Sequence, residues 1–372
     1  MEFRQGTMEV LVSSIESAWR DRPVFLTGHT GFKGGWLALW LHRMGAQVHG
    51  YALNPISEPG LFDVANVASA LASDTRADLA DVDTLKSRLN QSKSEVVFHL
   101  AAQPLVRESY RSPLTTLATN VIGTVNVLEA IRSTDSVQAV VLVTTDKVYD
   151  NKERSRPYRE SDQLGGRDVY SASKAAAEIV AASYRASFFG GENGHSARVA
   201  TARAGNVIGG GDWATDRLVP DCIRAFANQQ PVKLRYPNSV RPWQHVLEPL
   251  AGYLSLAEKL LSPAGPDFAK AWNFGPDVTG EATVGEVASL AARIWEDGAE
   301  VICAKSDSDP HEAGLLKLDC ELARRELGWR PVWSLEQALQ ETVIWHKAQL
   351  QGEDMYGLTL GQISAYEKLM RS

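Results

Sequence analysis

Apolar and polar positions alternate along this chain in a pattern that predicts a layered α/β protein. Short runs rich in Val, Ile, Leu and Phe are each followed by a longer stretch with helical spacing. The runs lie at Val24–Thr27, Val48–Leu53, Val96–Ala101, Val140–Thr145 and Val199–Ala204. Apolar runs that alternate with helices are typical of buried parallel strands. We therefore predict a Rossmann-type, doubly wound parallel sheet.

The helical stretches are expected at Gly34–Arg43, Val82–Asn90, Leu114–Arg132 and Tyr170–Phe189. In the first of them, Trp36 and Trp40 share one face with Leu37 and Leu41. A stripe of this kind usually packs into the core. We interpret these aromatic side chains as core residues.

After Asn206 the alternation gives way to turns rich in Gly and Pro. Short strands are expected at Val232–Tyr236 and Ala271–Phe274, and helices near Val284–Trp295, Cys320–Leu327 and Leu335–Leu350. We predict an NAD-binding domain of residues 1–206 and 240–278, in which 1–20 are an N-terminal extension. A smaller, interleaved C-terminal lobe of residues 207–239 and 279–372 would bind the substrate.

Length and charge narrow the range of functions. A chain of 372 residues is too long for one small module. Its net charge of −7 provides no overall positive field to bind a nucleic acid or an anionic membrane surface. An anionic small molecule must therefore be held by local positive groups.

Cysteines and termini indicate a reducing compartment. The three cysteines, Cys222, Cys303 and Cys320, are widely spaced and odd in number, which argues against a disulfide framework. The acidic start resembles no signal peptide, and no run approaches 18 consecutive apolar residues. We expect a cytoplasmic protein without a membrane span. The eight scattered histidines form no metal-binding motif, so no metal is expected.

A glycine-rich element follows the first predicted strand. Its residues are Gly28, His29, Thr30, Gly31, Phe32, Lys33 and Gly34. Glycines at this spacing let the backbone turn tightly and approach a pyrophosphate at a helix N-terminus. Because the element lies between a buried strand and a helix, we prefer a dinucleotide site over a plain tight turn.

The second strand lacks the usual ribose-binding acid. Val48–Asn54 contains neither Asp nor Glu, and no Arg stands nearby to bind a 2′-phosphate. We therefore predict NAD rather than NADP, held less tightly than usual. Asp78 and Leu79 are candidates to contact the adenine, although Asp78 is equally expected as a turn or cap residue. Small residues at Ala101 and Ala102, followed by Gln103, would let the dinucleotide lie across the sheet edge.

Tyr170 and Lys174 lie four residues apart and so share one helix face. The helix follows the strand that ends at Thr145. A neighbouring ammonium and the nicotinamide charge would favour the phenolate of Tyr170. Tyr170 would then accept a proton from a sugar hydroxyl that also bonds to Thr145. The alternative is a surface tyrosine beside a helical neighbour.

Together these motifs resemble the extended short-chain dehydrogenase/reductase family of nucleotide-sugar enzymes, which begin by oxidising the sugar C4 hydroxyl. The resemblance covers roughly Arg22 to Lys347. It is carried by Gly28–Trp36, Ala101–Arg107, Tyr149–Glu153, Arg203–Trp213, Arg241–Val246, Trp272–Pro276 and His311–Ala313.

Within this family, the residues after Thr145 distinguish the reactions. Asp146 and Lys147 resemble the pattern of the CDP-glucose 4,6-dehydratases, which are hydro-lyases acting on CDP-D-glucose. The resemblance implies that Asp146 protonates the departing C6 hydroxyl. Lys147 would remove the C5 proton, provided that burial or nearby positive charge lowers its pKa. His29 would assist that tuning, contact phosphate or simply pack.

The resemblance also supplies substrate-binding candidates and a partner. The residues expected to bind the nucleotide sugar are Arg107, Asn206, Arg217, Arg241 and His311. The helices at Leu114–Arg132 and Tyr170–Phe189 correspond to those that form a dimer interface in relatives, so at least a homodimer is expected. Deoxysugar formation for a surface polysaccharide is the expected pathway.

Two other functions stay open at this point. A nucleotide-sugar epimerase or decarboxylase of the same fold would leave Asp146 and Lys147 incidental. A non-catalytic NAD sensor would make the Thr145, Tyr170 and Lys174 set unnecessary.

Overall fold

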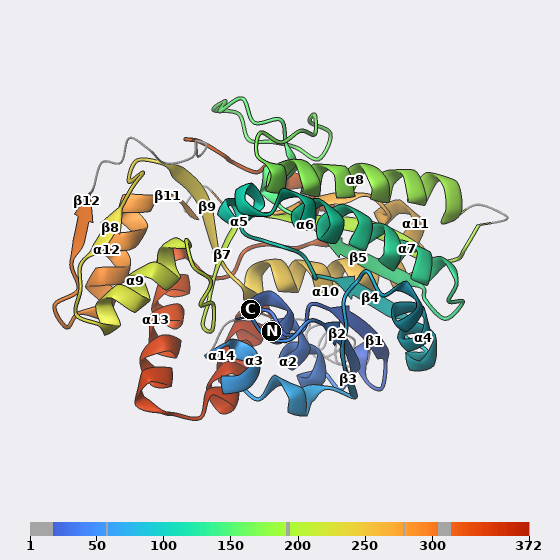
Figure 1. Cartoon of the computed structure of the whole chain (residues 1–372), viewed down its shortest axis with the longest axis horizontal. Helices are drawn as coiled ribbons and strands as arrows, with labels where there is room; N and C mark the ends of the chain where they lie inside the picture. Colours follow the sequence, from blue (N-terminus) through green and yellow to red (C-terminus); the bar gives the residue numbers. More distant parts are fainter. Residues whose placement is uncertain (1–17, 57–58, 191–193, 278–279, 304–313, 372) are drawn as a thin grey trace, which may run out of the picture.

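A seven-stranded parallel sheet forms the centre of the protein (Figure 1), as predicted. The computed structural model describes residues 18–56, 59–190, 194–277, 280–303 and 314–371. The strand order is β10-β6-β5-β4-β1-β2-β3, with every neighbouring pair parallel. The strands are β1 (Pro23–Thr27), β2 (Gln47–Ala52), β3 (Ser73–Arg76), β4 (Val96–His99), β5 (Ala139–Val143), β6 (Arg198–Ala204) and β10 (Ala271–Phe274).

Alternate strand residues face opposite layers of helices, because successive side chains of a strand point to opposite faces. Val24 and Leu26 of β1 belong to one buried cluster, whereas Phe25 between them belongs to another. The first cluster includes α2 (Phe32–Arg43) and α10 (Leu247–Leu261). The second includes α4 (Val82–Ser92), α7 (Gly123–Arg132) and α8 (Val169–Phe188). The sheet is therefore covered on both faces, which explains its continuous apolar runs.

A smaller lobe stands at one end of the sheet (Figure 1). It contains two small sheets, with the orders β11-β9-β7 and β12-β8. Their strands are β7 (Asn206–Ile208), β8 (Val232–Leu234), β9 (Val240–His245), β11 (Glu281–Thr283) and β12 (Val301–Cys303). Helices α9 (Leu218–Ala227), α12 (Val284–Trp295) and α13 (Leu335–Gln351) complete a third buried cluster with them.

The last helix, α14 (Met355–Met370), returns to the main sheet. Trp40 of α2 donates its indole N–H to Glu367 (2.9 Å) and meets Tyr366 edge to face. The predicted domain boundaries stay a prediction, and this packing places the end of the chain beside the first domain. The remaining short helices are α3 (Leu61–Val64), η1 (Val67–Ala70), α5 (Val106–Arg111), α6 (Pro113–Leu117), η2 (Ala118–Ile122), η3 (Asp146–Val148), α11 (Gly265–Phe268) and η5 (Ala323–Leu327).

The predicted helix at Leu114–Arg132 is interrupted by a π-helical turn, η2. Asn120 in that turn points inward and donates to Gln103 O (3.0 Å) and Ser173 Oγ (2.9 Å). These bonds tie the end of β4 to the helix that carries Tyr170. The helix widens into a π-helical turn where Asn120 makes these bonds. Such turns are common near functional sites.

Several elements were absent from the sequence prediction. Strand β3 is polar, because as an edge strand it leaves most of its side chains in solvent and so shows no apolar run. Helices α9, α10 and α14 were also missed. The predicted helix at Cys320–Leu327 contains a π-helical stretch, η5. Most of the predicted N-terminal extension lies outside the described residues.

The continuous segment Pro113–Arg132 is long and apolar enough to cross a membrane, judged by length and composition alone. No run of consecutive apolar residues signals it, because polar residues are spread through it. Part of this segment is buried against the sheet and against α8. Core helices pass the same test, so the segment is weak evidence for a membrane protein.

Glu248 on α10 connects three parts of the chain and is fully buried. Its carboxylate accepts the main-chain N–H of Trp333 (2.7 Å) and of Val332 (3.0 Å), and the hydroxyl of Tyr366 (2.5 Å). Because two of these donors, Trp333 and Tyr366, belong to buried residues, Glu248 fastens α14 and the segment before α13 to the core.

Replacing Glu248 with Ala should lower the free energy of unfolding by about 2–5 kcal/mol, because three donors, two of them in buried residues, lose their acceptor. Denaturant titration at constant pH measures the loss. Glu336→Ala is the matched control, since that carboxylate is 70% exposed, and it should change stability by less than about 0.5 kcal/mol. Equal effects of the two substitutions would contradict this role of Glu248.

Candidate active site

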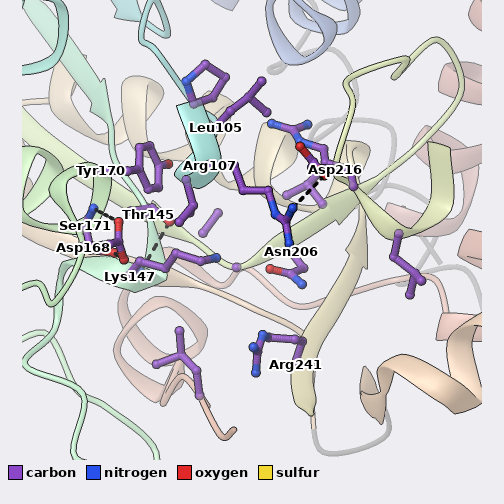
Figure 2. A pocket seen from close by; sticks show the side chains of 18 of the residues that line it. Leu105, Arg107, Thr145, Lys147, Asp168, Tyr170, Ser171, Asn206, Asp216 and Arg241 are labelled. Carbon is purple, nitrogen blue, oxygen red and sulfur yellow. Dashed lines mark hydrogen bonds and ion pairs between the residues drawn. The ribbon is translucent and has the colours of Figure 1, made fainter. Parts of the chain in front are cut away.

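A cavity of about 780 Å³ opens at the carboxyl edge of the sheet, between the sheet and the smaller lobe. Phe32, Lys33, Thr145, Lys147, Tyr170 and Lys174 line it from one side, and Asn206, Arg217 and Arg241 from the other. Figure 2 shows several of these side chains directed toward the common space. In open α/β sheets this edge is where ligands bind.

The glycine-rich turn between β1 and α2 requires its glycines for steric reasons. Gly28 has φ +81°, and a Cβ there would lie 2.7 Å from the main-chain N of Ala101. A Cβ on Gly34 would lie 2.1 Å from Gly28 O. Thr30 donates its hydroxyl to Leu53 O at the end of β2 (3.0 Å). The turn leaves the N-terminus of α2 beside the end of β4, which fits a pyrophosphate.

His29 does not lie where a residue tuning Lys147 would be. Its ring is fully buried, bonds through Nε2 to Asp74 (2.9 Å) and meets Phe62 edge to face. A Cβ on Gly50 would stand 2.7 Å from the ring. Of the three roles left open for His29, which were tuning of Lys147, a phosphate contact and packing, these contacts support packing. Burial lowers the pKa of His29, although its bond to Asp74 opposes that shift.

The premise that no cation stands near the end of β2 is also wrong. Arg76 of β3 stacks on Phe62 (4.4 Å to the ring centre) and forms an ion pair with Asp74 (2.7 Å). The charge of Arg76 is therefore balanced by a neighbouring carboxylate. The sequence carried no signal for this pair, because β3 has no apolar pattern.

The other cofactor candidates divide into lining and supporting residues. Ala102 lines the cavity, whereas the Gln103 amide bonds within the loop to Thr116 (2.9 Å) and Leu105 O (3.0 Å). Asp78 accepts from Ala80 N (2.9 Å), which is the turn role offered as its alternative. Leu79 is buried against Gly123. Their contact with adenine stays a prediction.

Tyr170 and Lys174 lie together on the first turns of α8, as predicted. Asp168 caps this helix by accepting from Ser171 N (2.9 Å), and Lys174 Nζ donates to Val143 O (3.2 Å). Burial lowers the pKa of Lys174 to about 8. Burial raises the pKa of Tyr170 to about 12, and a hydrogen bond with Thr145 and the charge of Arg217 oppose that rise. The structure therefore adds Thr145 and Arg217 to the groups that favour the phenolate.

One turn beyond Lys174, Glu178 forms a buried network that the sequence analysis missed. Its carboxylate accepts from Thr144 (2.5 Å), Thr201 (2.8 Å) and Arg203 Nη2 (2.8 Å). Its charge also opposes the lowering of the Lys174 pKa by burial. The spacing of four residues after Lys174 was the available signal, because it puts Glu178 on the same face.

Thr145, Asp146 and Lys147 follow the end of β5 and begin the short helix η3. Thr145 Oγ1 donates to Asp146 Oδ1 (3.0 Å), and Lys147 Nζ lies 3.8 Å from that same oxygen. Asp146 is fully buried, and its Oδ2 has no hydrogen-bond partner among the described residues. Lys147 extends into the cavity with 31% of its side chain exposed, so of the two conditions that the sequence argument offered, burial or nearby positive charge, burial is not met.

Lys33 is the amine whose environment is most perturbed. Its Nζ donates to Tyr253 Oη of α10 (3.0 Å). Burial and repulsion from Arg217 and Lys174 lower the pKa of Lys33 to about 7. Sequence analysis placed Lys33 at the cofactor through the glycine-rich turn, and the structure adds that its side chain turns toward the catalytic groups.

Arginines line the part of the cavity next to the smaller lobe. Arg107 and Arg235 each lie near Asp216, at 3.6 and 3.5 Å, and Arg217 pairs with Asp212 at 2.8 Å. Figure 2 shows Arg107 and Arg241 with Asn206 between them. Arg235 and the two aspartates were not predicted. His311 lies outside the described residues.

Among the described residues, no group of three or more His, Cys, Asp or Glu is arranged to hold a metal ion. Cys222 and Cys320 are buried free thiols, and burial raises the pKa of Cys222 to about 12. The cavity therefore presents tyrosine, threonine, carboxyl, amine and guanidinium groups for its chemistry.

Comparison with known proteins agrees with this arrangement. The chain is 47% identical over 350 residues to a CDP-glucose 4,6-dehydratase of Salmonella typhimurium, covering 94% of this chain and 97% of that protein. It is 28% identical over 273 residues to a dTDP-glucose 4,6-dehydratase of Streptomyces antibioticus, covering 73% and 75% of the two chains.

Among solved structures, the epimerase Mth375 of Methanothermobacter thermautotrophicus matches with a TM-score of 0.79 at 21% identity, covering 92% and 96% of the two chains. A dTDP-glucose 4,6-dehydratase of Bacillus anthracis matches with a TM-score of 0.71 at 21% identity, covering 89% and 98%. These structures support the fold. The profile of the GDP-mannose 4,6 dehydratase family matches residues 25–342, and the chain belongs to that family.

Proposed function

We propose that the protein is a CDP-glucose 4,6-dehydratase, which converts CDP-D-glucose to CDP-4-dehydro-6-deoxy-D-glucose and water with bound NAD. The observation that carries this proposal is the Thr145-Asp146-Lys147 sequence at the end of β5, next to Tyr170 and Lys174 at one cavity. The nearly full-length similarity to a protein of that activity supports the choice of substrate.

The residues present fit NAD. The N-terminus of α2 offers main-chain N–H groups to a pyrophosphate, and the Gly28 turn lets the backbone approach it. Ala102 leaves room at the end of β4 for a flat ring system. When bound, NAD accepts a hydride from C4 and returns it to C6.

In the first step, Tyr170 accepts the proton of the C4 hydroxyl. Thr145 shares the same hydroxyl and, like the charge of Arg217, favours the phenolate of Tyr170. Lys174, held by Val143 O, would orient the nicotinamide ribose when the cofactor is bound. Oxidation at C4 then acidifies the C5 proton.

In the second step, Lys147 removes the C5 proton and Asp146 protonates the departing C6 hydroxyl. Of these two residues, Lys147 extends into the cavity, whereas Asp146 lies just beneath the cavity wall. This division gives the base direct access to the sugar. The acid is kept apart from solvent.

The arginine-lined end of the cavity is the proposed diphosphate site. Arg107, Arg217 and Arg241, with Asn206 between the lobes, supply donors and positive charge for a diphosphate. Recognition of cytosine, including any contribution of His311, rests on the family resemblance.

We also propose that a second copy of this chain covers the outer face of α6, η2 and α8. Leu114 is 82% exposed and Ile179 is 59% exposed, and Leu117 and Ile122 extend the same apolar surface. These helices contact each other, and the exposed apolar side chains on them are the surface that we assign to the partner copy. We propose that the protein acts as a homodimer in the cytoplasm. It would supply deoxysugars for a surface polysaccharide.

Incubation with NAD and CDP-glucose labelled with deuterium at C4 should give a product that has lost one water and carries deuterium at C6. Mass spectrometry and NMR measure both changes. Inversion at C4 with no loss of water would instead identify an epimerase and refute the proposed reaction.

Asp146→Asn should slow the elimination at least about 100-fold while slowing C4 oxidation much less, because the amide cannot donate a carboxyl proton. Single-turnover absorbance of the reduced nicotinamide separates the two phases, which appear as its rise and its decay. Asp297→Asn, at a carboxylate that is 75% exposed and outside the cavity lining, is the matched control. An unchanged decay in Asp146→Asn would exclude the acid role.

Ile179→Asp should convert the dimer to a monomer, because a buried unpaired carboxylate at an apolar interface costs several kcal/mol. Light scattering at matched concentrations measures the molar mass. Ile344→Asp, at a comparably exposed position on α13, should leave the mass unchanged. Equal masses for wild type and Ile179→Asp would exclude this face as the dimer interface.

A further inference from the structure

The cavity extends past its arginines to an apolar wall on the smaller lobe. Arg217, at the start of α9, still acts through its charge on Tyr170 and Lys33. Farther along α9, the wall is built from apolar side chains of α9, β8 and the start of α12. They are Leu218, Val219, Pro220, Val232, Leu234 and Val284. Figure 1 shows α9 and β8 at the end of the molecule that lies away from α8.

The order of groups in a nucleotide sugar matches the order of groups along this cavity. With the sugar at Tyr170 and the diphosphate at the arginines, the ribose and base extend toward α9 and β8. A flat base binds best on apolar surface that carries a few placed polar groups. The apolar wall is therefore the position of the base in the proposed complex.

Asp221 is the acid on this wall, and it lines the cavity. Its main-chain N–H donates to Arg217 O (2.9 Å), so the two residues are one helical turn apart on the same face of α9. A rise of about 1.5 Å per residue puts Asp221 about 6 Å along the helix axis from Arg217. Arg224, Asp216 and Arg235 are the charged groups that act most on Asp221.

One oxygen of Asp221 is held in place and the other is available to a ligand. Arg224, on the next turn, pairs with Oδ1 and lies outside the cavity lining. Its guanidinium is itself fixed by donating to Trp213 O (2.9 Å). Among the described residues, Oδ2 accepts no hydrogen bond, and it is not one of the buried polar atoms. With 37% of the side chain exposed, the carboxylate offers a free acceptor.

The other two acids of the cavity have a different explanation. Asp212 pairs with Arg217, and Asp216 lies near Arg107 and Arg235. These acids hold cavity arginines in position, whereas the ion-pair partner of Asp221 lies outside the lining. A carboxylate close to a diphosphate site repels the ligand unless it binds another part of it.

Pyrimidine bases differ at the position that a carboxylate distinguishes best. Cytosine carries an amino group at C4, which donates, whereas uracil carries a carbonyl oxygen there, which repels a carboxylate. We propose that Asp221 accepts a hydrogen bond from the cytosine amino group and thereby selects cytidine over uridine nucleotides. This inference rests on the proposed dehydratase function and names the residue that chooses its nucleotide.

A structural role for Asp221 predicts a different result. An acid in the first turn of a helix stabilises that helix, and Asp221 and Arg224 form a pair at i,i+3. Loss of such a role weakens the binding of every nucleotide alike. Reading of the base changes the ratio of the affinities for two nucleotides, so that ratio is the readout.

The test compares the binding of CDP and UDP by isothermal titration calorimetry. Wild type should bind CDP at least about tenfold more tightly than UDP. In Asp221→Asn the two affinities should come within about threefold of each other, because an amide can present either an oxygen or an N–H to the base. Asp297→Asn, at an exposed carboxylate outside the cavity lining, should keep the wild-type ratio.

Two results would overturn this assignment: equal affinities of wild type for CDP and UDP, or a wild-type ratio in Asp221→Asn, even with both nucleotides bound more weakly. The dehydratase function is checked apart from binding, by loss of water from CDP-glucose in wild type. A protein that prefers CDP through Asp221 and releases no water would refute that function and leave the role of Asp221 standing.

A ligand variant tests the same contact should Asp221→Asn fail to fold. The pyrimidin-2-one analogue of CDP lacks the 4-amino group and keeps the ribose and the diphosphate. Wild type should bind this analogue at least about tenfold more weakly than CDP, because the carboxylate loses its donor. Equal affinities for CDP and the analogue would show that the amino group is not read.

Discussion

The Glu178 carboxylate holds together the elements on which the active site depends. It joins α8, which carries Tyr170 and Lys174, to Thr144 at the end of β5 and to Thr201 and Arg203 of β6. Thr144 is adjacent to Thr145. One buried acid therefore sets the distance of Tyr170 and Lys174 from Asp146 and Lys147. A buried charge of this kind is tolerated only because Arg203 and two hydroxyls satisfy it.

Charge in this protein is arranged locally and not over the whole surface. The net charge of −7 would repel a nucleotide sugar at long range. The cavity nevertheless gathers Lys33, Lys147, Arg107, Arg217 and Arg241 at its walls. Asp212 and Asp216 hold two of these side chains, Arg217 and Arg107, in place, and a bound diphosphate would compete with or add to those contacts. The binding of an anion therefore depends on a few positioned guanidinium groups.

Buried placement also divides the labour among the catalytic groups. Lys147 reaches the cavity, whereas Asp146 lies beneath it behind Gly205. Asp146 is thereby shielded from solvent. Lys33, on α2, has an amine whose pKa is lowered to about 7 by burial and by nearby positive charge.

Much of the sheet was predictable, because its strands are buried on both faces and therefore read as apolar runs. The dyad and the Thr145-Asp146-Lys147 sequence were predictable because the spacing within one helix or strand end fixes their neighbourhood. Strand β3 was not, since an edge strand carries polar residues, and with it the Asp74–Arg76 pair and the true environment of His29 were missed. The π-turn at Asn120 was likewise hidden within an ordinary helical pattern.

The sequence by itself determined the order of strands and helices, the glycine-rich turn and the residues available for catalysis, because these depend on local spacing. The tertiary structure decided which of those groups are buried. Asp146 is buried, whereas its neighbour Lys147 is not. Lys33 donates to Tyr253, and Glu178 is buried with Arg203 as its partner. Those outcomes depend on contacts between residues far apart in the chain, which spacing along the sequence does not specify.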